Sequence, residues 1–236
     1  MHIFVEKIVG ETVEIVNEDF FHLARVLRCR KGDSLTIVSL SDSFYVQATV
    51  ASINKHNIIA TINSKIEKPP KKYPQIILYQ AIAKKAKMDV ILQKAVELGV
   101  SKIVPLITKN VVPENPNVER WRTIVKEASM QSRRVDIPVV EQPITLSEML
   151  KQKPATCMCL VESGEQRLDF RDYLEGLDKS VQQLGVVIGA EGGFTQPEKL
   201  LFLENNVAAI SFGENILRTE TAAIAALSVL KWFYKI

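Results

Sequence analysis

Two stretches near the C-terminal end constrain the fold of this chain most: Gly189–Glu198 (GAEGGFTQPE) and Gly213–Leu227 (GENILRTETAAIAAL). Each joins a short apolar run to a helix-like pattern through a loop that contains glycine. The run Leu184–Ile188 precedes the first loop, and Val207–Phe212 precedes the second. Two adjacent strand–loop–helix units of this kind predict an α/β sheet that binds a ligand beyond the carboxyl ends of its strands.

The residues of the first loop favour both a tight turn and a helix start. Gly192 and Gly193 permit a left-handed backbone or the close approach of a ligand. Thr195 followed by Glu198 has the spacing of a capping box, so a helix should begin there. The second helix is expected from about Thr219. A strand–helix turn that binds nothing is the alternative interpretation of the first loop.

The length of 236 residues is typical of one large or two modest domains. No apolar run approaches the roughly 20 residues of a membrane-spanning helix. The start MHIFVEKIVG lacks a basic segment and carries Glu6, so we expect no signal peptide and no membrane partner. The three cysteines cannot all pair, and they fit reduced core thiols of a cytoplasmic protein better than a metal site.

Charge is distributed unevenly along the chain. Residues 1–72 hold 10 Lys and Arg against 8 Asp and Glu, and residues 84–134 hold 11 against 5. The remainder, from residue 135, holds 9 against 14. This division favours a protein that binds a polyanion with its first half and carries the reactive site in its second half. Scattered, solvated surface charge would give the same counts.

The first 70 residues have the pattern of a small β-barrel with one helix. Strand signals lie at Val5–Val9, Glu11–Val16, Leu35–Leu40, Tyr45–Ile53 and Ile58–Ile62. Helical spacing covers Asp19–Leu27. The segment 68–74 contains three prolines that fit neither a strand nor a helix, so it is interpreted as a linker between domains 1–70 and 71–236.

From Gln75 onward, strand and helix signals alternate, which predicts a mostly parallel α/β sheet. The predicted strands are Ile76–Ala81, Lys102–Ile107, Cys157–Val161, Leu184–Ile188 and Val207–Phe212. The predicted helices are Met88–Gly99, Trp121–Ser132, Leu146–Leu150, Pro197–Glu204 and one from about Thr219.

Elimination narrows the chemistry of the C-terminal loops. The only histidines are His2, His22 and His56, so a Ser–His or Cys–His pair cannot form from residues of these loops. The chain lacks zinc-ligand spacing, a phosphate loop and a dinucleotide fingerprint. The Gly192–Gly193 loop also carries no Lys or Arg. These loops therefore favour a weakly charged, adenosine-like ligand over a nucleoside triphosphate, and no metal is expected.

With these two motifs, the chain resembles the RsmE family of 16S rRNA (uracil-N3)-methyltransferases in the SPOUT superfamily. The likeness runs the length of the chain. It includes Arg25–Arg28 before Lys31–Asp33, the helix pattern Lys87–Val100 and the block Trp121–Ser132. The two C-terminal motifs together are specific to the family, whereas each short N-terminal match alone is weak.

The resemblance implies a PUA-like β-barrel that binds RNA over residues 1–70. It implies a SPOUT α/β domain with a deep trefoil knot over residues 71–236. A knot would not follow from physical reasoning, because threaded chains are close to absent among folds. The family further implies a cytoplasmic homodimer that binds S-adenosyl-L-methionine and methylates N3 of a uridine in 16S rRNA of the small ribosomal subunit.

Site residues are carried over by position. The cofactor would lie against Val161, Ile188, Gly189, Gly192, Gly193, Phe212, Gly213, Ile216, Leu217 and Arg218. Arg218 is the candidate cation that stabilises charge on the uracil, or it forms an ion pair with Glu214 or Glu220 that only orders the loop. Glu191 and Glu220 are catalytic candidates as bases or act as loop anchors.

Basic residues outside these loops are interpreted as RNA phosphate contacts, with ordinary solvated charge as the alternative. They are Arg25, Arg28, Arg30, Lys31, Lys84, Lys85, Lys87, Arg133 and Arg134. Phe20 and Trp121 are expected in the core rather than as platforms for bases. Two other functions remain open: methylation of a different rRNA or tRNA position, and an RNA-binding assembly factor without catalysis.

Overall fold

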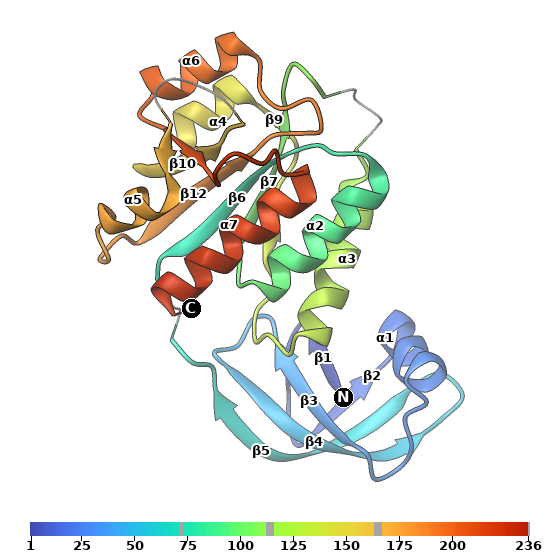
Figure 1. The fold of residues 1–236 in the computed structure, drawn as a ribbon. Helices are drawn as coiled ribbons and strands as arrows, with labels where there is room; N and C mark the ends of the chain where they lie inside the picture. Colours follow the sequence, from blue (N-terminus) through green and yellow to red (C-terminus); the bar gives the residue numbers. More distant parts are fainter. Residues whose placement is uncertain (71–72, 112–115, 163–166, 236) are drawn as a thin grey trace. The chain divides into compact units, whose positions relative to one another are not determined.

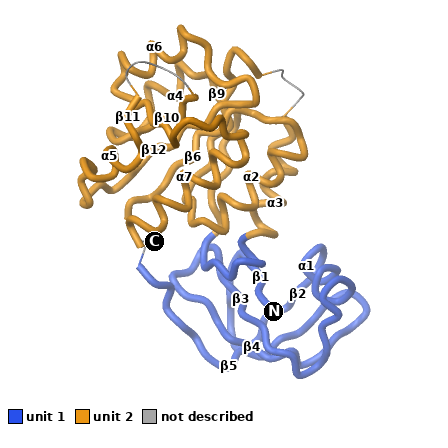
Figure 2. The backbone as a smooth tube through the Cα atoms, in the orientation of Figure 1, with its two compact units in different colours: residues 1–70, 129–136 blue, residues 71–128, 137–236 orange. Residues whose placement is uncertain are grey.

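The structure, a computed structural model, describes residues 1–70, 73–111, 116–162 and 167–235. It divides into two compact units, coloured separately in Figure 2. The first consists of residues 1–70 and 129–136, and the second of residues 71–128 and 137–236. The segment 129–136 therefore belongs to the first unit although it is remote from residue 70 in sequence. The domain bounds 1–70 and 71–236 stay a prediction.

A mixed five-stranded sheet in the order β1-β3-β4-β5-β2 forms the first unit (Figure 1). Its strands are β1 (His2–Val5), β2 (Thr12–Ile15), β3 (Ser34–Ser39), β4 (Phe44–Ile53) and β5 (Ile58–Glu67). β1 pairs in parallel with β3, and the other pairs are antiparallel. The predicted strand Val5–Val9 is wrong: β1 ends at Val5, where the Ser41 hydroxyl, at 2.7 Å, donates to the carbonyl of Glu6.

Helix α1 (Asn17–Phe21) continues into the π-helix η1 (His22–Val26) where the sequence predicts a single helix. Phe20 and Leu23 are buried at 7% and 0% exposure, so Phe20 is a core residue as expected. These two buried side chains anchor α1 and η1 in the core of the first unit.

The second unit contains a sheet in the order β11-β13-β10-β12-β6-β7-β8, with β9 paired to β7. Every pair in it is parallel, which confirms the predicted parallel α/β sheet. The strands are β6 (Gln75–Ala81), β7 (Lys102–Ile107), β8 (Val139–Val140), β9 (Ile144–Thr145), β10 (Thr156–Leu160), β11 (Leu168–Asp169), β12 (Gln183–Ile188) and β13 (Ala208–Ser211). The two-residue strands β8, β9 and β11 carry too short a pattern to be predicted.

The helices of this unit are α2 (Lys85–Glu97), α3 (Val118–Gln131), α4 (Leu146–Gln152), α5 (Phe170–Glu175), α6 (Gln196–Glu204) and α7 (Thr219–Tyr234). Figure 1 shows α2 and α7 side by side. The reason lies in α7, where Ala223, Ala226, Leu227 and Leu230 recur at helical spacing and are 1% exposed or less. The small alanine side chains on this face of α7 permit its close packing against α2.

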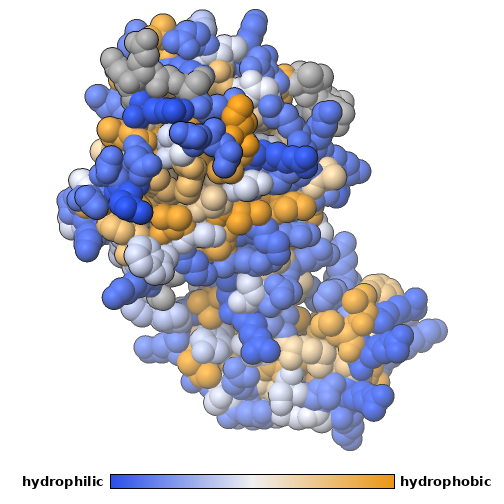
Figure 3. All heavy atoms as spheres, in the orientation of Figure 1, coloured by the Kyte–Doolittle hydropathy of each residue, from blue (hydrophilic) through white to orange (hydrophobic). Residues whose placement is uncertain are grey.

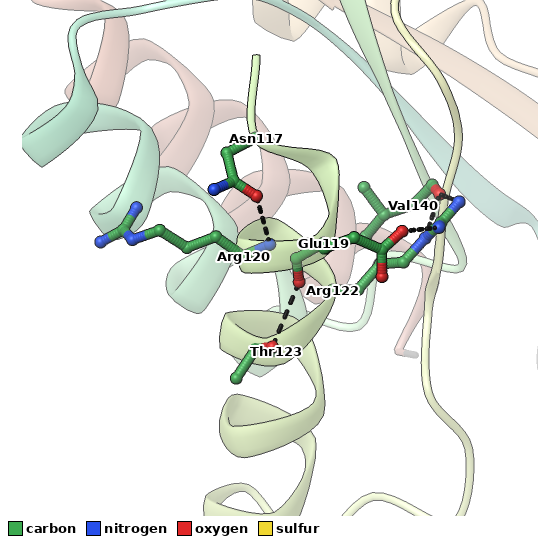
Figure 4. Close-up of polar contacts among 6 residues, drawn as sticks. All are labelled: Asn117, Glu119, Arg120, Arg122, Thr123 and Val140. Atoms are coloured by element: carbon green, nitrogen blue, oxygen red, sulfur yellow. Dashed lines mark hydrogen bonds and ion pairs between the residues drawn. The ribbon is translucent and has the colours of Figure 1, made fainter. Parts of the chain in front are cut away.

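Polar contacts hold the start of α3, as Figure 4 shows. The Asn117 side chain accepts a hydrogen bond from the N–H of Arg120 at 2.9 Å, which satisfies a free donor of the first turn. The Arg122 guanidinium pairs with Glu119 and donates to the carbonyl of Val140 at 3.3 Å. The first turn of α3 is thereby tied to the end of β8.

Candidate functional site

A cavity of about 270 Å³ lies beyond the carboxyl ends of β10, β12 and β13. These strands are neighbours in the sheet, so the loops that follow them meet at one edge. All of the predicted cofactor-binding residues line this cavity: Val161, Ile188, Gly189, Gly192, Gly193, Phe212, Gly213, Ile216, Leu217 and Arg218. The structure thus brings together in space three segments that are far apart in the sequence.

Glycine is required at specific points of the cavity wall. Gly193 and Gly213 have φ angles of 61° and 96°, a conformation that other residues adopt only with strain. At Gly189, an added Cβ would lie 3.3 Å from Gly193 Cα and 3.3 Å from the ring of Phe194. Gly189 therefore allows the loop to pack closely against Gly193 and Phe194.

A buried hydrogen-bond chain fixes the carbonyl of Gly189. The Thr219 hydroxyl donates to this carbonyl at 2.6 Å and accepts from Gln80 Nε2 at 3.0 Å. Thr219 is 5% exposed and Gln80 is 0% exposed, so water does not replace these bonds. The chain connects the end of β6, the first residue of α7 and the end of β12.

Replacing Thr219 with valine should lower the free energy of unfolding by about 1–3 kcal/mol, because the buried Gln80 amide loses its acceptor and the carbonyl of Gly189 loses its donor. Thr219→Ser retains the hydroxyl and should recover most of this loss. Urea denaturation of the two variants and the wild type measures the difference. Equal stability of the valine and serine variants would contradict a role for the hydroxyl.

The glycine loop is also tied to the segment that follows β7. Asn110 Nδ2 donates to the carbonyl of Gly192 at 2.7 Å and to that of Gly193 at 3.3 Å. Glu198, near the start of α6, accepts from the N–H of Lys109 at 2.8 Å and from the N–H and hydroxyl of Thr195. The expected capping residue Thr195 and helix start are confirmed.

An ion pair lies at the cavity: Lys87 Nζ is 3.1 Å from Glu191 Oε1. The N–H of Lys84 also donates to Glu191 at 3.4 Å. Burial by itself would raise the pKa of Glu191, but hydrogen bonds from its own N–H, from Lys87 and from Lys84 outweigh burial and lower the pKa. Glu191 therefore connects the glycine loop to the start of α2 as an ionised group.

Arg218 lines the cavity at the position before α7 and is exposed. Within the described part of the chain it forms no ion pair, with Glu214 and Glu220 included. Glu220 does not line the cavity, and its Oε2 is buried without a hydrogen-bond partner among the described residues. The guanidinium is thus available to a bound molecule.

The predicted RNA contacts occupy different places. Arg25, Arg28, Arg30 and Lys31 are exposed in the first unit, and Lys84 and Lys85 are exposed at the start of α2. Lys87 lines the cavity instead. Arg133 is exposed, whereas Arg134 pairs with Asp136 at 2.9 Å.

The sequence interpretation missed Gln80, Asn110 and Glu162. Glu162 follows β10 and lines the cavity, so its place directly after a strand was a signal that could have been used. Gln80 and Asn110 act through partners remote in sequence, for which a single sequence contains no signal.

The predicted reduced thiols are confirmed, since Cys29, Cys157 and Cys159 are free and buried. Burial raises the pKa of Cys157 to about 12, so it is an unreactive thiol. Among the described residues there is no cluster of His, Cys, Asp and Glu suited to a metal. The helices within those residues include none long and apolar enough to span a membrane.

Comparison with known proteins assigns both parts of the chain. Residues 69–231 match the family model of an RNA methyltransferase domain, and residues 15–63 match that of an RNA methyltransferase PUA domain. The ribosomal RNA small subunit methyltransferase E of Rickettsia conorii is 32% identical over 93% of this chain and 89% of the relative. The protein of the same name from Bacillus subtilis is 30% identical over 94% of this chain and 90% of the relative.

Solved structures agree with this assignment. The ribosomal RNA small subunit methyltransferase E from Neisseria gonorrhoeae, bound to S-adenosyl methionine, has a TM-score of 0.87 at 27% identity and covers 99% of this chain and 97% of its own. A putative methyltransferase from Legionella pneumophila in complex with the same cofactor has a TM-score of 0.88 at 30% identity, covering 98% and 96%. The chain therefore belongs to the RNA methyltransferase family whose curated members are named ribosomal RNA small subunit methyltransferase E.

Proposed function

We propose that this protein transfers a methyl group from S-adenosyl-L-methionine to N3 of a uridine in 16S rRNA of the small ribosomal subunit. The observation that carries the proposal is the cavity at the carboxyl ends of β10, β12 and β13, lined by both C-terminal motifs. Its relatives are named ribosomal RNA small subunit methyltransferase E, and two structurally similar proteins bind this cofactor, which supports the proposal.

The cavity residues fit an adenosine-bearing molecule that lacks phosphates. The backbone of Gly189, Gly192 and Gly193 lines the cavity, and no cation belongs to this loop. Ile216 and Leu217 supply apolar walls. The cofactor would be held by the ten cavity residues named above, and when bound it supplies an electrophilic methyl group.

Arg218 is proposed as the catalytic cation. N3 of uracil lies on the Watson–Crick edge, so the base must be unpaired before it can enter the site. Removal of the imide proton leaves negative charge on the uracil oxygens, and a fixed guanidinium stabilises that charge. The exposed, unpaired guanidinium of Arg218 at the cavity suits this role.

The two carboxylates receive different roles in the proposal. Glu191 is held by Lys87 and has a lowered pKa, so it is a weak proton acceptor and acts as the loop anchor. Glu220 does not line the cavity and keeps one buried carboxylate oxygen without a partner among the described residues, so its candidate role as the base stays a prediction.

The proposal also covers the two domains, the oligomeric state and the location in the cell. We propose a PUA-like barrel that binds RNA at residues 1–70 and a knotted SPOUT domain at residues 71–236. We also propose a homodimer and a cytoplasmic location. The support is the family resemblance of the two C-terminal motifs together with the match of residues 15–63 to a PUA domain.

Purified protein with methyl-labelled cofactor should label 16S rRNA, either free or within assembled small subunits, because the proposed site holds both reactants. Mapping of the labelled nucleotide should give N3-methyluridine. Label at another base or in tRNA would favour the alternative function, methylation of a different rRNA or tRNA position. Cofactor binding by calorimetry without transfer to any RNA would favour the assembly factor.

A further inference from the structure

Three apolar side chains in the segment formed by α1, η1 and the following residue Leu27 are exposed. Phe21, Val26 and Leu27 are exposed by 49%, 67% and 44%, whereas Phe20 and Leu23 of the same segment are buried. Single exposed apolar residues are common in proteins, but three this close together in the sequence mark an interaction surface. The helix widens here into η1, and π-turns occur frequently at functional sites.

Cations accompany this apolar surface. Arg25 places its guanidinium carbon 5.3 Å from the centre of the Phe21 ring, within range of a cation–π contact. Arg28, Arg30 and Lys31 follow within the same exposed segment. Across the described residues, none of these four cations forms an ion pair. Figure 3 shows hydrophobic next to hydrophilic surface in the region of α1.

We propose that Phe21, Arg25, Val26 and Leu27, here termed the stacking face, bind an unpaired nucleobase of the RNA substrate. This inference rests on the proposed function, because the partner is taken to be RNA. An aromatic ring with an adjacent guanidinium provides the flat apolar contact that a base requires, and the neighbouring cations match the phosphates beside it. Bases within a duplex are stacked on each other, so the stacking face selects single-stranded segments.

The stacking face adds a role that phosphate contacts do not supply. Arg28, Arg30 and Lys31 position the backbone without reading the bases. Stacking on Phe21 instead distinguishes an open loop from a helix of the same charge. The first unit would therefore select an unpaired region of the RNA.

The test replaces Phe21 with alanine in the full-length protein. We expect the variant to bind single-stranded 16S rRNA fragments about 5- to 150-fold more weakly than the wild type, the loss of one stacked base. The dependence of affinity on salt should stay unchanged, because no charge is removed. Phe21→Tyr keeps the ring and should bind like the wild type.

Two further variants separate stacking from charge and from general surface effects. Arg28→Gln should reduce the slope of log affinity against log salt concentration by about 1, the contribution of one phosphate contact. Val9→Ala removes an apolar side chain that is 73% exposed elsewhere in the first unit and should leave affinity unchanged. Thermal unfolding and cofactor affinity of all variants should equal those of the wild type.

The inference is overturned if Phe21→Ala binds single-stranded RNA as well as Val9→Ala does. It is also overturned if the alanine variant loses equal affinity for a perfect RNA duplex, since stacking requires an open base. Failure of the wild type to methylate any RNA would instead refute the proposed activity, and the binding comparison would still decide the role of Phe21.

Discussion

Replacing Arg218 with alanine should slow methyl transfer by about 10²–10³-fold, the usual cost of removing one donor that stabilises developing negative charge. The affinity for 16S rRNA should remain nearly intact, because one guanidinium within a cavity contributes little to a large electrostatic interface. Single-turnover transfer from labelled cofactor, measured beside a filter-binding assay, gives both quantities from the same preparation.

Two variants control this experiment. Arg218→Lys keeps the charge but loses the planar fork, so it should recover only part of the rate. Arg171→Ala removes an exposed cation from α5 in the same unit and should leave the rate unchanged. Loss of rRNA affinity as large as the loss of rate would assign Arg218 to binding instead of to the chemical step.

Phe202→Ala should have the largest effect on stability, a loss of about 3–5 kcal/mol in the free energy of unfolding. Phe202 is 1% exposed, and its ring packs edge-to-face on Phe194 with 4.8 Å between centroids. Phe194 lines the cavity, so the variant should also bind the cofactor more weakly. Urea denaturation and calorimetry measure the two effects.

The control for Phe202 lies on the same helix. Leu200 is 50% exposed, and Leu200→Ala should change stability by no more than about 0.5 kcal/mol. Similar losses in both variants would contradict the assignment of Phe202 as a core residue, because alanine favours a helix at both positions.

Regular elements with a strong pattern were predictable from the sequence. The strand Lys102–Ile107 has the bounds of β7, and the helix expected from Thr219 is α7. β7 is a nearly continuous apolar run, and α7 repeats buried apolar residues at helical spacing. The end of β1 was not predictable in this way, because hydrogen bonds from the Ser41 segment to Glu6, distant in sequence, decide where the strand stops.

The position of the cavity was predictable from the sequence, but the hydrogen bonds that hold its loops in place were not. Glycine after a strand marks the end of β12 and of β13 in the sequence itself. The bonds from Gln80 to Thr219 and from Asn110 to Gly192 join residues brought together only by the order of strands in the sheet. Periodicity reports which face of an element is buried, but it carries no information about partners across the fold.

The composition of the first unit has a consequence for the newly made chain. Residues 129–136 complete this unit, and His2 bonds through its ring to the carbonyl of Arg134 at 2.7 Å. During translation, domains usually fold in order as they leave the ribosome. Here residues 1–70 must wait until β6, α2, β7 and α3 have been synthesised. A truncation after residue 70 would thus yield an incomplete unit, and expression of the isolated first unit should include residues 129–136.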